Sequence, residues 1–414
     1  MSPAGWARLA EAAERTASEM KPQGIANSLN ALCKLEAAAA AVSPTGWTGL
    51  AEAAERTARV MNPQDIANSL NALCKFEAAA AAVSPTGWTG LVEAAERTAR
   101  EMNPQDMANT LNALCKIEAA AAAVSTTGWA GLAKAVECTA REMNPQNVAN
   151  SLNALSKLEA AAAVVSPTGW KRLAVAAERT AREMSTRGVA NSLNALNKLE
   201  AAAAAVSATG WAGLAKAAER TSREMNPQEI ANTLNALCKL EAAAAVVSPT
   251  GWAGLAEAVE RTASEMKPQE IANTLNALIK LKAATVSVSP TGWAGLAEAA
   301  ERTASQMNEQ QVANTLNALS KLEAAAAAVS PMGWAGLAEA AERTASQMNE
   351  QNISNSLHAL GLLPTAAAEL SPSARQHLEA AAEREAPNMP SEGRRMTLLG
   401  CEKLKLRIPS AFLE

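Results

Sequence analysis

Amide and ammonium side chains recur at a fixed interval along this chain of 414 residues. In one period, Asn68, Asn71 and Lys75 fall on the same side of a helix when successive residues are placed 100° apart. Amides donate and accept hydrogen bonds, and ammonium groups donate and carry positive charge, so such a row can bind a polar or anionic polymer. The residues predicted to line a ligand-binding groove are Asn27, Asn30, Lys34, Asn68, Asn71, Lys75, Asn109, Asn112, Lys116, Asn150, Asn153, Lys157, Asn191, Asn194, Lys198, Asn232, Asn235, Lys239, Asn273, Asn276, Lys280, Asn314, Asn317 and Lys321.

A structural role would explain the same asparagines. Asn inside a helix costs roughly 0.5 kcal/mol relative to Ala, so its recurrence requires something that offsets this cost. One interpretation is an asparagine ladder, in which each amide bonds to its neighbour or to the backbone of the next unit. Recent duplication of the unit is a second interpretation, and a ladder and a binding face are compatible with each other.

Catalytic chemistry is hard to place in this sequence. The two histidines, His358 and His377, lie near the C-terminus, where the periodic pattern degrades. No nucleophile elbow, phosphate loop, His-Glu-x-x-His or Cys-x-x-Cys motif occurs. Four of the six cysteines share one periodic position that also accepts Ser, Asn or Ile, which indicates free thiols and suits a reducing intracellular compartment. We therefore expect a non-catalytic protein with no metal, cofactor or small-molecule substrate.

Tryptophan sets the period of the elements that must position this row. The nine Trp residues follow one another at intervals of 41 residues, without an insertion. Such a period with one large apolar anchor is typical of a stacked α-solenoid or a propeller. Aromatic residues make up only 3% of the chain and Ala-rich stretches recur, which favours helices over strands. We predict an all-α, right-handed α-solenoid of nine tandem 41-residue two-helix repeats, anchored by Trp6, Trp47, Trp88, Trp129, Trp170, Trp211, Trp252, Trp293 and Trp334.

Each repeat carries two signals for the start of a helix. Ser43 and Asn62 each precede a proline, which suits an N-cap followed by the first helical position. The first helix is expected to end near Met61, with a very short turn before the second. Its apolar stripe makes Trp47 a core anchor rather than a base-stacking platform, and its solvent side holds Glu52, Glu55, Arg56 and Arg59.

The end of the second helix is ambiguous in the sequence. Glu77 falls near its core face, so this residue either marks a bend or pairs with Arg56. The Ala-rich stretch that follows, ending at Val83, most simply continues the second helix, and a separate short third helix is the alternative. Small side chains allow close approach, so residues 78–82 are interpreted as packing surface between repeats.

Three segments are expected along the chain. Residues 2–362 form the nine-repeat solenoid, residues 363–390 a degenerate capping half-repeat, and residues 391–414 a loosely docked C-terminal tail. In the half-repeat Arg375 stands at the Trp position, and a charge there suits a cap whose outer face meets water. Within the array, Ser185-Thr186-Arg187-Gly188 replaces the usual Asn-Pro-Gln-Asp, so we expect lower local stability in the fifth repeat.

Charge and hydropathy bound the function. The net charge of −4 and the isoelectric point near 5.6 give no basic footprint, which counts against strong nucleic-acid binding without excluding it. No apolar run is long enough for a membrane span. No signal or transit peptide is visible, so either the mature protein has no leader or the sequence begins inside a longer gene.

The second helix carries a resemblance to known repeat families. Residues 61–75, Met-Asn-Pro-Gln-Asp-Ile-Ala-Asn-Ser-Leu-Asn-Ala-Leu-Cys-Lys, resemble the octotricopeptide and heptatricopeptide repeats of organellar RNA factors, which often carry a RAP domain. Residues 314–321, Asn-Thr-Leu-Asn-Ala-Leu-Ser-Lys, also resemble the SKWP repeats of type III effectors. The likeness covers residues 2–362. It departs from the octotricopeptide pattern in its longer repeat, in Asn71 at a position where Trp is common, and in lacking a RAP-like module.

The resemblance implies a function. Octotricopeptide-like proteins bind single-stranded RNA in mitochondria or chloroplasts and act in RNA processing or translation. By the same resemblance, specificity positions would lie near the start of the second helix, in the neighbourhood of Asp65 and Asn68. The variation between repeats at the Asp65 position is either a code or drift at an exposed helix N-terminus. The alternative is a protein-protein interaction scaffold or a secreted repeat effector, with a peptide or protein ligand in the groove.

Overall fold

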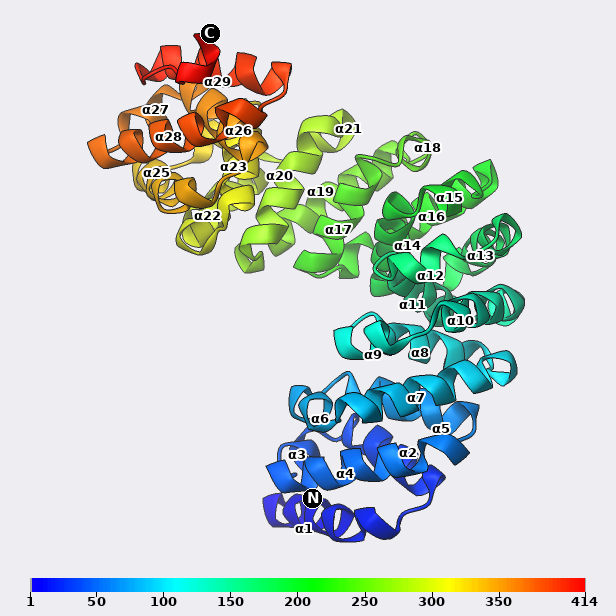
Figure 1. The fold of residues 1–414 in the computed structure, drawn as a ribbon. Coiled ribbons are helices and arrows are strands. Elements are labelled where there is room, and N and C mark those ends of the chain that lie inside the picture. The colour runs from blue at the N-terminus through cyan, green and yellow to red at the C-terminus, as the bar shows by residue number, and fades with distance from the viewer. Residues whose placement is uncertain (1, 414) are drawn as a thin grey trace. The chain divides into compact units, whose positions relative to one another are not determined.

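The computed structural model describes residues 2–413, and the regular structure within them is entirely helical (Figure 1). Helices recur with the 41-residue period, which confirms the predicted tandem helical-repeat fold. The described chain divides into two compact parts, called here the N-terminal part (residues 2–214) and the C-terminal part (residues 215–413).

The first helix of each repeat begins at the expected Ser-Pro signal. In α4 the side chain of Ser43 accepts a hydrogen bond from the backbone N–H of Gly46 at 2.9 Å, and Pro44 occupies the first turn. The same start recurs along the chain, also where Thr or Ala replaces the proline. The first helices are α1 (Pro3–Thr16), α4 (Pro44–Thr57), α7 (Pro85–Thr98), α10 (Thr126–Thr139), α13 (Pro167–Thr180), α16 (Ala208–Thr221), α19 (Pro249–Thr262), α22 (Pro290–Thr303), α25 (Pro331–Thr344) and α28 (Pro372–Glu385).

A single 3₁₀ turn follows each first helix, so the α-helix ends a turn earlier than Met61. The hydroxyl of Thr57 bonds back to the carbonyl of Ala53 at 2.7 Å, and Met61 is extended. These turns are η1 (Ala17–Glu19), η2 (Ala58–Val60), η3 (Ala99–Glu101), η4 (Ala140–Glu142), η5 (Ala181–Glu183), η6 (Ser222–Glu224), η7 (Ala263–Glu265), η8 (Ala304–Gln306), η9 (Ala345–Gln347) and η10 (Ala386–Asn388), and a further turn, η11 (Ser410–Phe412), lies near the C-terminus.

The second helix starts at the expected Asn-Pro signal, with Asn62 accepting from the backbone N–H of Asp65 at 2.8 Å. In the fifth repeat, Ser185 replaces Asn as the N-cap and accepts from Gly188. The second helices are α2 (Pro22–Leu32), α5 (Pro63–Leu73), α8 (Pro104–Leu114), α11 (Pro145–Leu155), α14 (Thr186–Lys198), α17 (Pro227–Leu237), α20 (Pro268–Lys280), α23 (Glu309–Leu319), α26 (Glu350–Leu362) and α29 (Ser391–Leu404).

The Ala-rich stretch forms a separate short helix, so the simpler prediction of one continuous second helix is wrong. Phe76 is extended (φ −119°, ψ 117°), and the new helix begins at Glu77. Because of this break, Glu77 is exposed in the first turn of a new helix, where its negative charge is stabilised by the helix N-terminus. The predicted pair with Arg56 is not formed, since Arg56 donates to the carbonyl of Ala17. The third helices are α3 (Glu36–Ala39), α6 (Glu77–Ala82), α9 (Glu118–Ala123), α12 (Glu159–Ala163), α15 (Glu200–Ala204), α18 (Glu241–Ala244), α21 (Lys282–Thr285), α24 (Glu323–Ala328) and α27 (Pro364–Ala368).

The third helices pack mainly on the first helix of their own repeat, as α6 does on α4 and α9 on α7. Ala79 is the residue of α6 that is buried in this contact, whereas Ala78 and Ala81 are exposed. The expectation that residues 78–82 form the main packing surface between repeats is therefore wrong.

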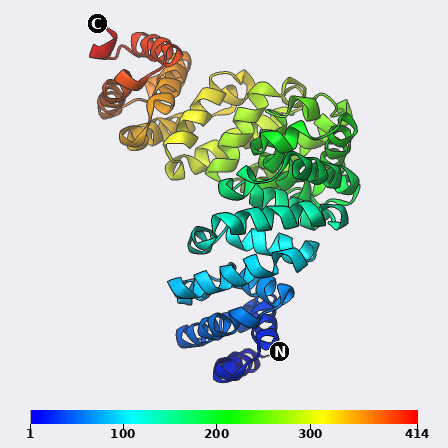
Figure 2. The same ribbon diagram turned by 45° about the vertical axis from the view of Figure 1, so that its right-hand side comes forward.

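Second helices pack side by side, and so do first helices. In the N-terminal part α2, α5, α8, α11 and α14 form one layer, and α1, α4, α7, α10 and α13 form the other (Figures 1 and 2). The apolar core lies between these layers, where Leu50, Ile66 and Leu70 have no exposed surface. Trp47 lies over Phe76 with ring centroids 5.1 Å apart and is only 6% exposed, which confirms Trp as a core anchor.

The segment predicted as a loose tail is largely a helix. The α29 helix occupies the second-helix position after α28 and η10, so a tenth two-helix repeat is present. Thr397 is fully buried and donates to the sulfur of Met389 at 3.3 Å, a contact that Thr110 and Met102 make in the third repeat. The helix packs along α26, and the proposed boundary at residue 391 does not mark the end of the repeat pattern.

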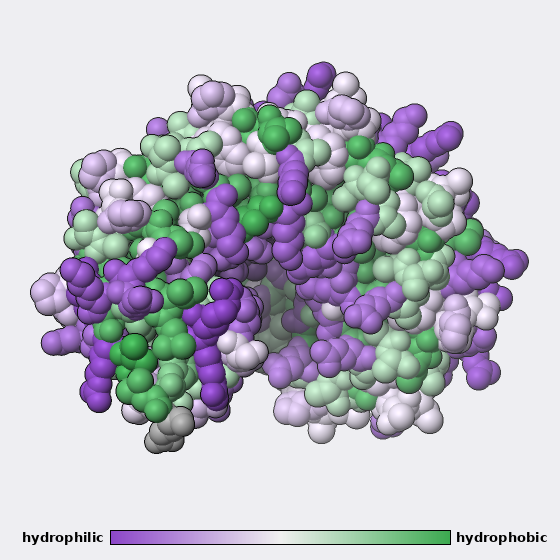
Figure 3. All heavy atoms as spheres, turned by 90° about the horizontal axis from the view of Figure 1, so that it is seen from above, coloured by the Kyte–Doolittle hydropathy of each residue, from purple (hydrophilic) through white to green (hydrophobic). Residues whose placement is uncertain are grey.

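On the face shown in Figure 3, hydrophilic side chains are interspersed with apolar groups. Among residues 2–413, no helix is long and apolar enough to cross a membrane.

Candidate functional site

The predicted asparagines and lysines, called here the amide–lysine row, lie on the second helices and the turns after them. Asn68 and Asn71 of α5 are half-buried, and Lys75 is exposed. The other asparagines of the row are half-buried and the other lysines are exposed, except that Asn27 is exposed. In most repeats the lysine lies in the turn just after the helix rather than on it, as Lys75 does after the C-cap Cys74. Within each repeat the structure therefore places these residues on the side of the second helix opposite its buried apolar residues.

A continuous asparagine ladder is not formed. Among residues 2–413, neighbouring amides of the row share one hydrogen bond, from Asn112 Nδ2 to Asn71 Oδ1 at 3.4 Å. The Oδ1 atom of Asn317 is buried without any hydrogen-bond partner. Self-pairing therefore does not account for the recurrence of Asn, and most of these amides keep their hydrogen-bonding capacity for another molecule.

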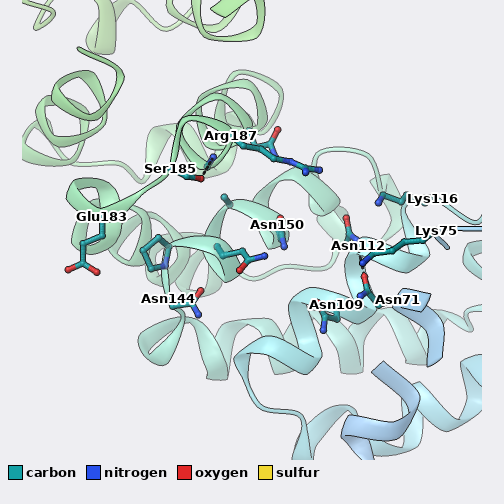
Figure 4. Close-up of a pocket in the computed structure, with 15 residues that line it drawn as sticks. Asn71, Lys75, Asn109, Asn112, Lys116, Asn144, Asn150, Glu183, Ser185 and Arg187 are labelled. Carbon is teal, nitrogen blue, oxygen red and sulfur yellow. Dashed lines mark hydrogen bonds between the residues drawn. The ribbon is translucent and has the colours of Figure 1, made fainter. Parts of the chain in front are cut away.

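Part of the row lines a hollow of about 570 Å³ in the N-terminal part (Figure 4). Asn71 and Lys75 reach it from the second repeat, and Asn112 and Lys116 from the third. Arg187, at the start of α14 in the fifth repeat, also lines it. The hollow thus spans the second helices of several consecutive repeats, which suits an extended ligand.

The hollow is positively charged on balance. Lys75, Lys116 and Arg187 face one carboxylate, Glu183, which Figure 4 shows on the opposite side from the two lysines. The lysines also act on the neighbouring thiol: burial raises the pKa of Cys74, and the charges of Lys116 and Lys75 oppose this rise. A locally cationic surface therefore exists on a chain whose net charge is −4.

The position that the resemblance marks for sequence specificity lies in the first turn of the second helix. Asp65 is only 6% exposed, and burial raises the pKa of its carboxyl while a hydrogen bond from the backbone of Asn62 opposes the rise. In the sixth repeat Glu229 reaches back to the backbone N–H of Asn226 at 3.0 Å and completes a capping box. In these two repeats the residue at this position takes part in the start of the second helix.

Eight of the repeats match one family model. Its description is "Protein of unknown function (DUF1601)", and the matched segments are residues 7–29, 49–70, 90–111, 131–152, 214–234, 254–275, 295–316 and 336–357. Each segment runs from the first helix into the second, and the fifth repeat has no matched segment. The chain is thus a helical-repeat protein whose matching family has no described function.

Two solved structures are similar over nearly the whole chain, at low scores. A homology model of the full-length AP-3 complex in an intermediate open conformation has 9% identity and a TM-score of 0.32, covering 98% of this chain and 83% of that one. The crystal structure of the pentatricopeptide repeat protein PPR10 from maize has 10% identity and a TM-score of 0.12, covering 96% and 91%. Neither score bears on function. A search of curated proteins found no match.

Charged residues assigned to the solvent face of the first helix instead couple neighbouring repeats. Glu55 accepts hydrogen bonds from the backbone N–H and the hydroxyl of Ser84, at 2.8 and 2.9 Å, across 29 residues. A Cβ at Gly87 would lie 2.1 Å from the Glu55 carboxyl, so glycine is required for this approach. In turn, Arg97 donates to the carbonyl of Met61 in the preceding repeat at 3.0 Å. Recurrence of Glu, Arg, Ser and Gly in nearly every repeat was the sequence signal for this contact.

The same contact closes the C-terminal end of the described array. Ser410 donates its backbone N–H and its hydroxyl to Glu383, as the serine of a following repeat would. Arg375, at the Trp position, donates to the carbonyls of Leu404 and Ala367 at 2.7 and 3.0 Å. The predicted charge replacement thus satisfies helix-end carbonyls.

Metal ligands do not gather in the described part of the chain: no group of three or more His, Cys, Asp or Glu residues there could hold an ion.

Proposed function

We propose that this protein binds single-stranded RNA along the amide–lysine row and does not catalyse a reaction. The observation that carries the proposal is the hollow beside Asn71, Asn112, Lys75 and Lys116, where exposed cations stand next to amides with unused hydrogen-bonding groups. Lysines neutralise phosphates, and amides can donate to and accept from the edges of unpaired bases.

A single strand suits this surface better than a duplex. The bases of a single strand can be splayed out and bonded at their edges, which a row of amides requires. The tryptophans of the second to ninth repeats are core residues and none lines the hollow, so the Arg187 guanidinium is the planar group available to stack on a base there. Recognition would therefore depend on amides and cations.

The test is a triple variant of consecutive repeats, Lys75→Gln, Lys116→Gln and Lys157→Gln. Gln keeps a similar helix propensity, so the fold should persist and can be checked by circular dichroism. Fluorescence anisotropy with a labelled single-stranded RNA should show affinity lowered by about tenfold or more, because phosphate contacts are lost.

A matched control removes the same number of exposed lysines elsewhere. Lys171→Gln, Lys216→Gln and Lys282→Gln lie on first and third helices, outside the row. The affinity of this second triple variant for RNA should stay close to that of the unchanged protein. Equal losses in the two triple variants, or no RNA binding at low salt, would reject the proposal in favour of a protein scaffold.

An organellar role in RNA processing or translation is part of this proposal and rests on the octotricopeptide resemblance. Expression of the full-length gene product with a fluorescent tag tests it, since an organellar factor should co-localise with mitochondria or chloroplasts. Secretion of the tagged protein would favour the effector alternative.

A further inference from the structure

A shallow hollow lies beside the first helix of several repeats, at the junction with the preceding repeat. In the seventh repeat it is lined by Gly254, Glu257, Ala258, Glu260 and Arg261, together with Arg223 of the sixth. Two arginines therefore face two glutamates, and the charges balance.

The equivalent hollow of the fifth repeat has a different lining. Its volume is about 440 Å³, and it is lined by Thr168, Ala176 and five residues that set its character: Arg141, Lys171, Arg172, Val175 and Arg179. Two repeats further along the chain, Ala253, Gly254 and Glu257 stand at the positions of Lys171, Arg172 and Val175. The hollow of the fifth repeat is thus lined by four cations, Arg141 coming from the fourth repeat, and by no carboxylate, whereas the hollow of the seventh is balanced.

The neighbouring carboxylates, Glu178 and Glu137, do not line this hollow, and hydrogen bonds hold each of them elsewhere. Glu178, on the same helix, accepts hydrogen bonds from the hydroxyls of Thr209 and Ser207 at 2.5 and 2.8 Å. Glu137, of the preceding repeat, accepts from the backbone N–H of Ser166 at 2.8 Å and pairs with Lys134 at 3.3 Å. Both belong to the contacts that join repeats.

Two of the cations are held in place. Arg172 donates from Nη1 to the carbonyl of Glu137 at 3.2 Å, and Arg179 donates from Nη2 to the carbonyl of Met143 at 2.7 Å. Val175 is 54% exposed beside them, at a position where the seventh repeat has an acidic side chain. An exposed aliphatic group beside fixed cations forms a surface with both an apolar and an anion-binding component.

We propose that this hollow, called here the fifth-repeat hollow, docks an acidic segment of a partner protein that also carries an aliphatic side chain. The cations match the acidic groups of the segment, and Val175 with Ala176 matches its aliphatic group. Nucleic acid fits less well, because an aliphatic pair offers bases no stacking or edge contacts. The hollow shares no residue with the amide–lysine row, so this site is independent of the proposed RNA binding.

The test uses the residues that other repeats already tolerate. The variant Lys171→Thr, Arg172→Gly and Val175→Glu gives the fifth repeat the residues that the second and third repeats carry there, so folding should be preserved. The probe is a short fluorescent peptide in which glutamates alternate with leucines, and a lysine–leucine peptide serves as its control. We expect the unchanged protein to bind the acidic peptide and not the lysine–leucine peptide. The variant should bind the acidic peptide at least about tenfold more weakly.

The reverse change supplies a gain-of-function control in the third repeat. Thr89→Lys, Gly90→Arg and Glu93→Val recreate the lining between Arg59 and Arg97, and a Cβ at Gly90 would meet no atom within 4 Å. Isothermal titration should then show a second peptide site. The proposal would be overturned by no binding of the acidic peptide, or by equal affinity in the Lys171→Thr, Arg172→Gly, Val175→Glu variant. Displacement of the peptide by single-stranded RNA in the Lys75→Gln, Lys116→Gln, Lys157→Gln background would also overturn it.

Discussion

At the scale of single residues, the glutamate near the end of each first helix joins its repeat to the next. Ser289 donates its hydroxyl to Glu260 at 2.7 Å, and Thr291 donates to the other carboxylate oxygen. Hydrogen bonds from Thr291 and then Ser289 lower the pKa of Glu260, and bonds from Thr209 and Ser207 lower that of Glu178. The charged form is therefore favoured in the folded repeat array.

These contacts predict a loss of stability in acid. Because the pKa of Glu260 in the folded state lies below its ordinary value of 4.5, the stabilisation is fully present above that pH and disappears as the pH falls through the lower, folded-state pKa. Glu260→Gln should destabilise the protein by about 1 kcal/mol at neutral pH, since solvent partly screens this half-buried contact. Thermal unfolding followed by circular dichroism should show the difference shrinking in acid.

Glu298→Gln is the control for this prediction, because Glu298 is an exposed residue of the neighbouring first helix, α22. It should leave the unfolding temperature nearly unchanged at every pH. A constant gap between Glu260→Gln and the unchanged protein down to low pH would contradict the assigned contact.

At the scale of helices, Trp holds each first helix in the core. Trp88 is 4% exposed, so Trp88→Ala should open a cavity costing about 3–5 kcal/mol. Because repeats couple mainly to their neighbours, limited proteolysis should cut within or next to the third repeat first. Trp6 is only half-buried, so Trp6→Ala should destabilise the protein clearly less than Trp88→Ala. Equal costs at the two positions would count against Trp88 as a core anchor.

A glycine governs the packing of the last second helix. A Cβ at Gly400 would lie 2.5 Å from the carbonyl carbon of Leu357, a backbone atom of α26 that cannot move aside cheaply. Gly400→Ala should therefore push α29 away from α26 and destabilise this contact by about 1–3 kcal/mol. Hydrogen exchange should rise in residues 391–404, whereas Gly90→Ala, with open space around it, should have little effect. Unchanged protection in α29 would contradict its tight packing.

Helix starts were predictable from the sequence, and helix ends were not. Ser43-Pro44 and Asn62-Pro63 act locally, because the cap and the first turn lie within a few residues. At the break, the ring of Phe76 contacts Trp47, which lies 29 residues away, and no local pattern encodes that contact. The α29 helix was missed because Met396 and Leu399 replace the usual asparagines, although Thr397 and Lys403 fall at their repeat positions.

The candidate site was predictable in the same partial way. A fixed period and helical geometry place Asn68, Asn71 and Lys75 on one face without knowledge of packing. The hollow beside them also needs Arg187, which lies more than a hundred residues further along and reaches it through the stacking of α8, α11 and α14. No local pattern encodes that approach.

At the scale of the whole molecule, charge distribution decides how binding can occur. The net charge of −4 gives no long-range attraction for a polyanion. Affinity for RNA must then come from the exposed lysines of the row, of which Lys34 and Lys321 are the first and last. Each phosphate contact changes the slope of log K against log salt by about −0.7 on a single strand.

The salt dependence of RNA binding is therefore the most direct test of the amide–lysine row. Dissociation constants for a single-stranded RNA should be measured over a series of salt concentrations, for the unchanged protein and for Lys75→Gln, Lys116→Gln, Lys157→Gln. The account predicts a slope shallower by about 2 in the variant, from three lost phosphate contacts. Parallel lines for the two proteins, or no measurable binding at the lowest salt, would contradict it.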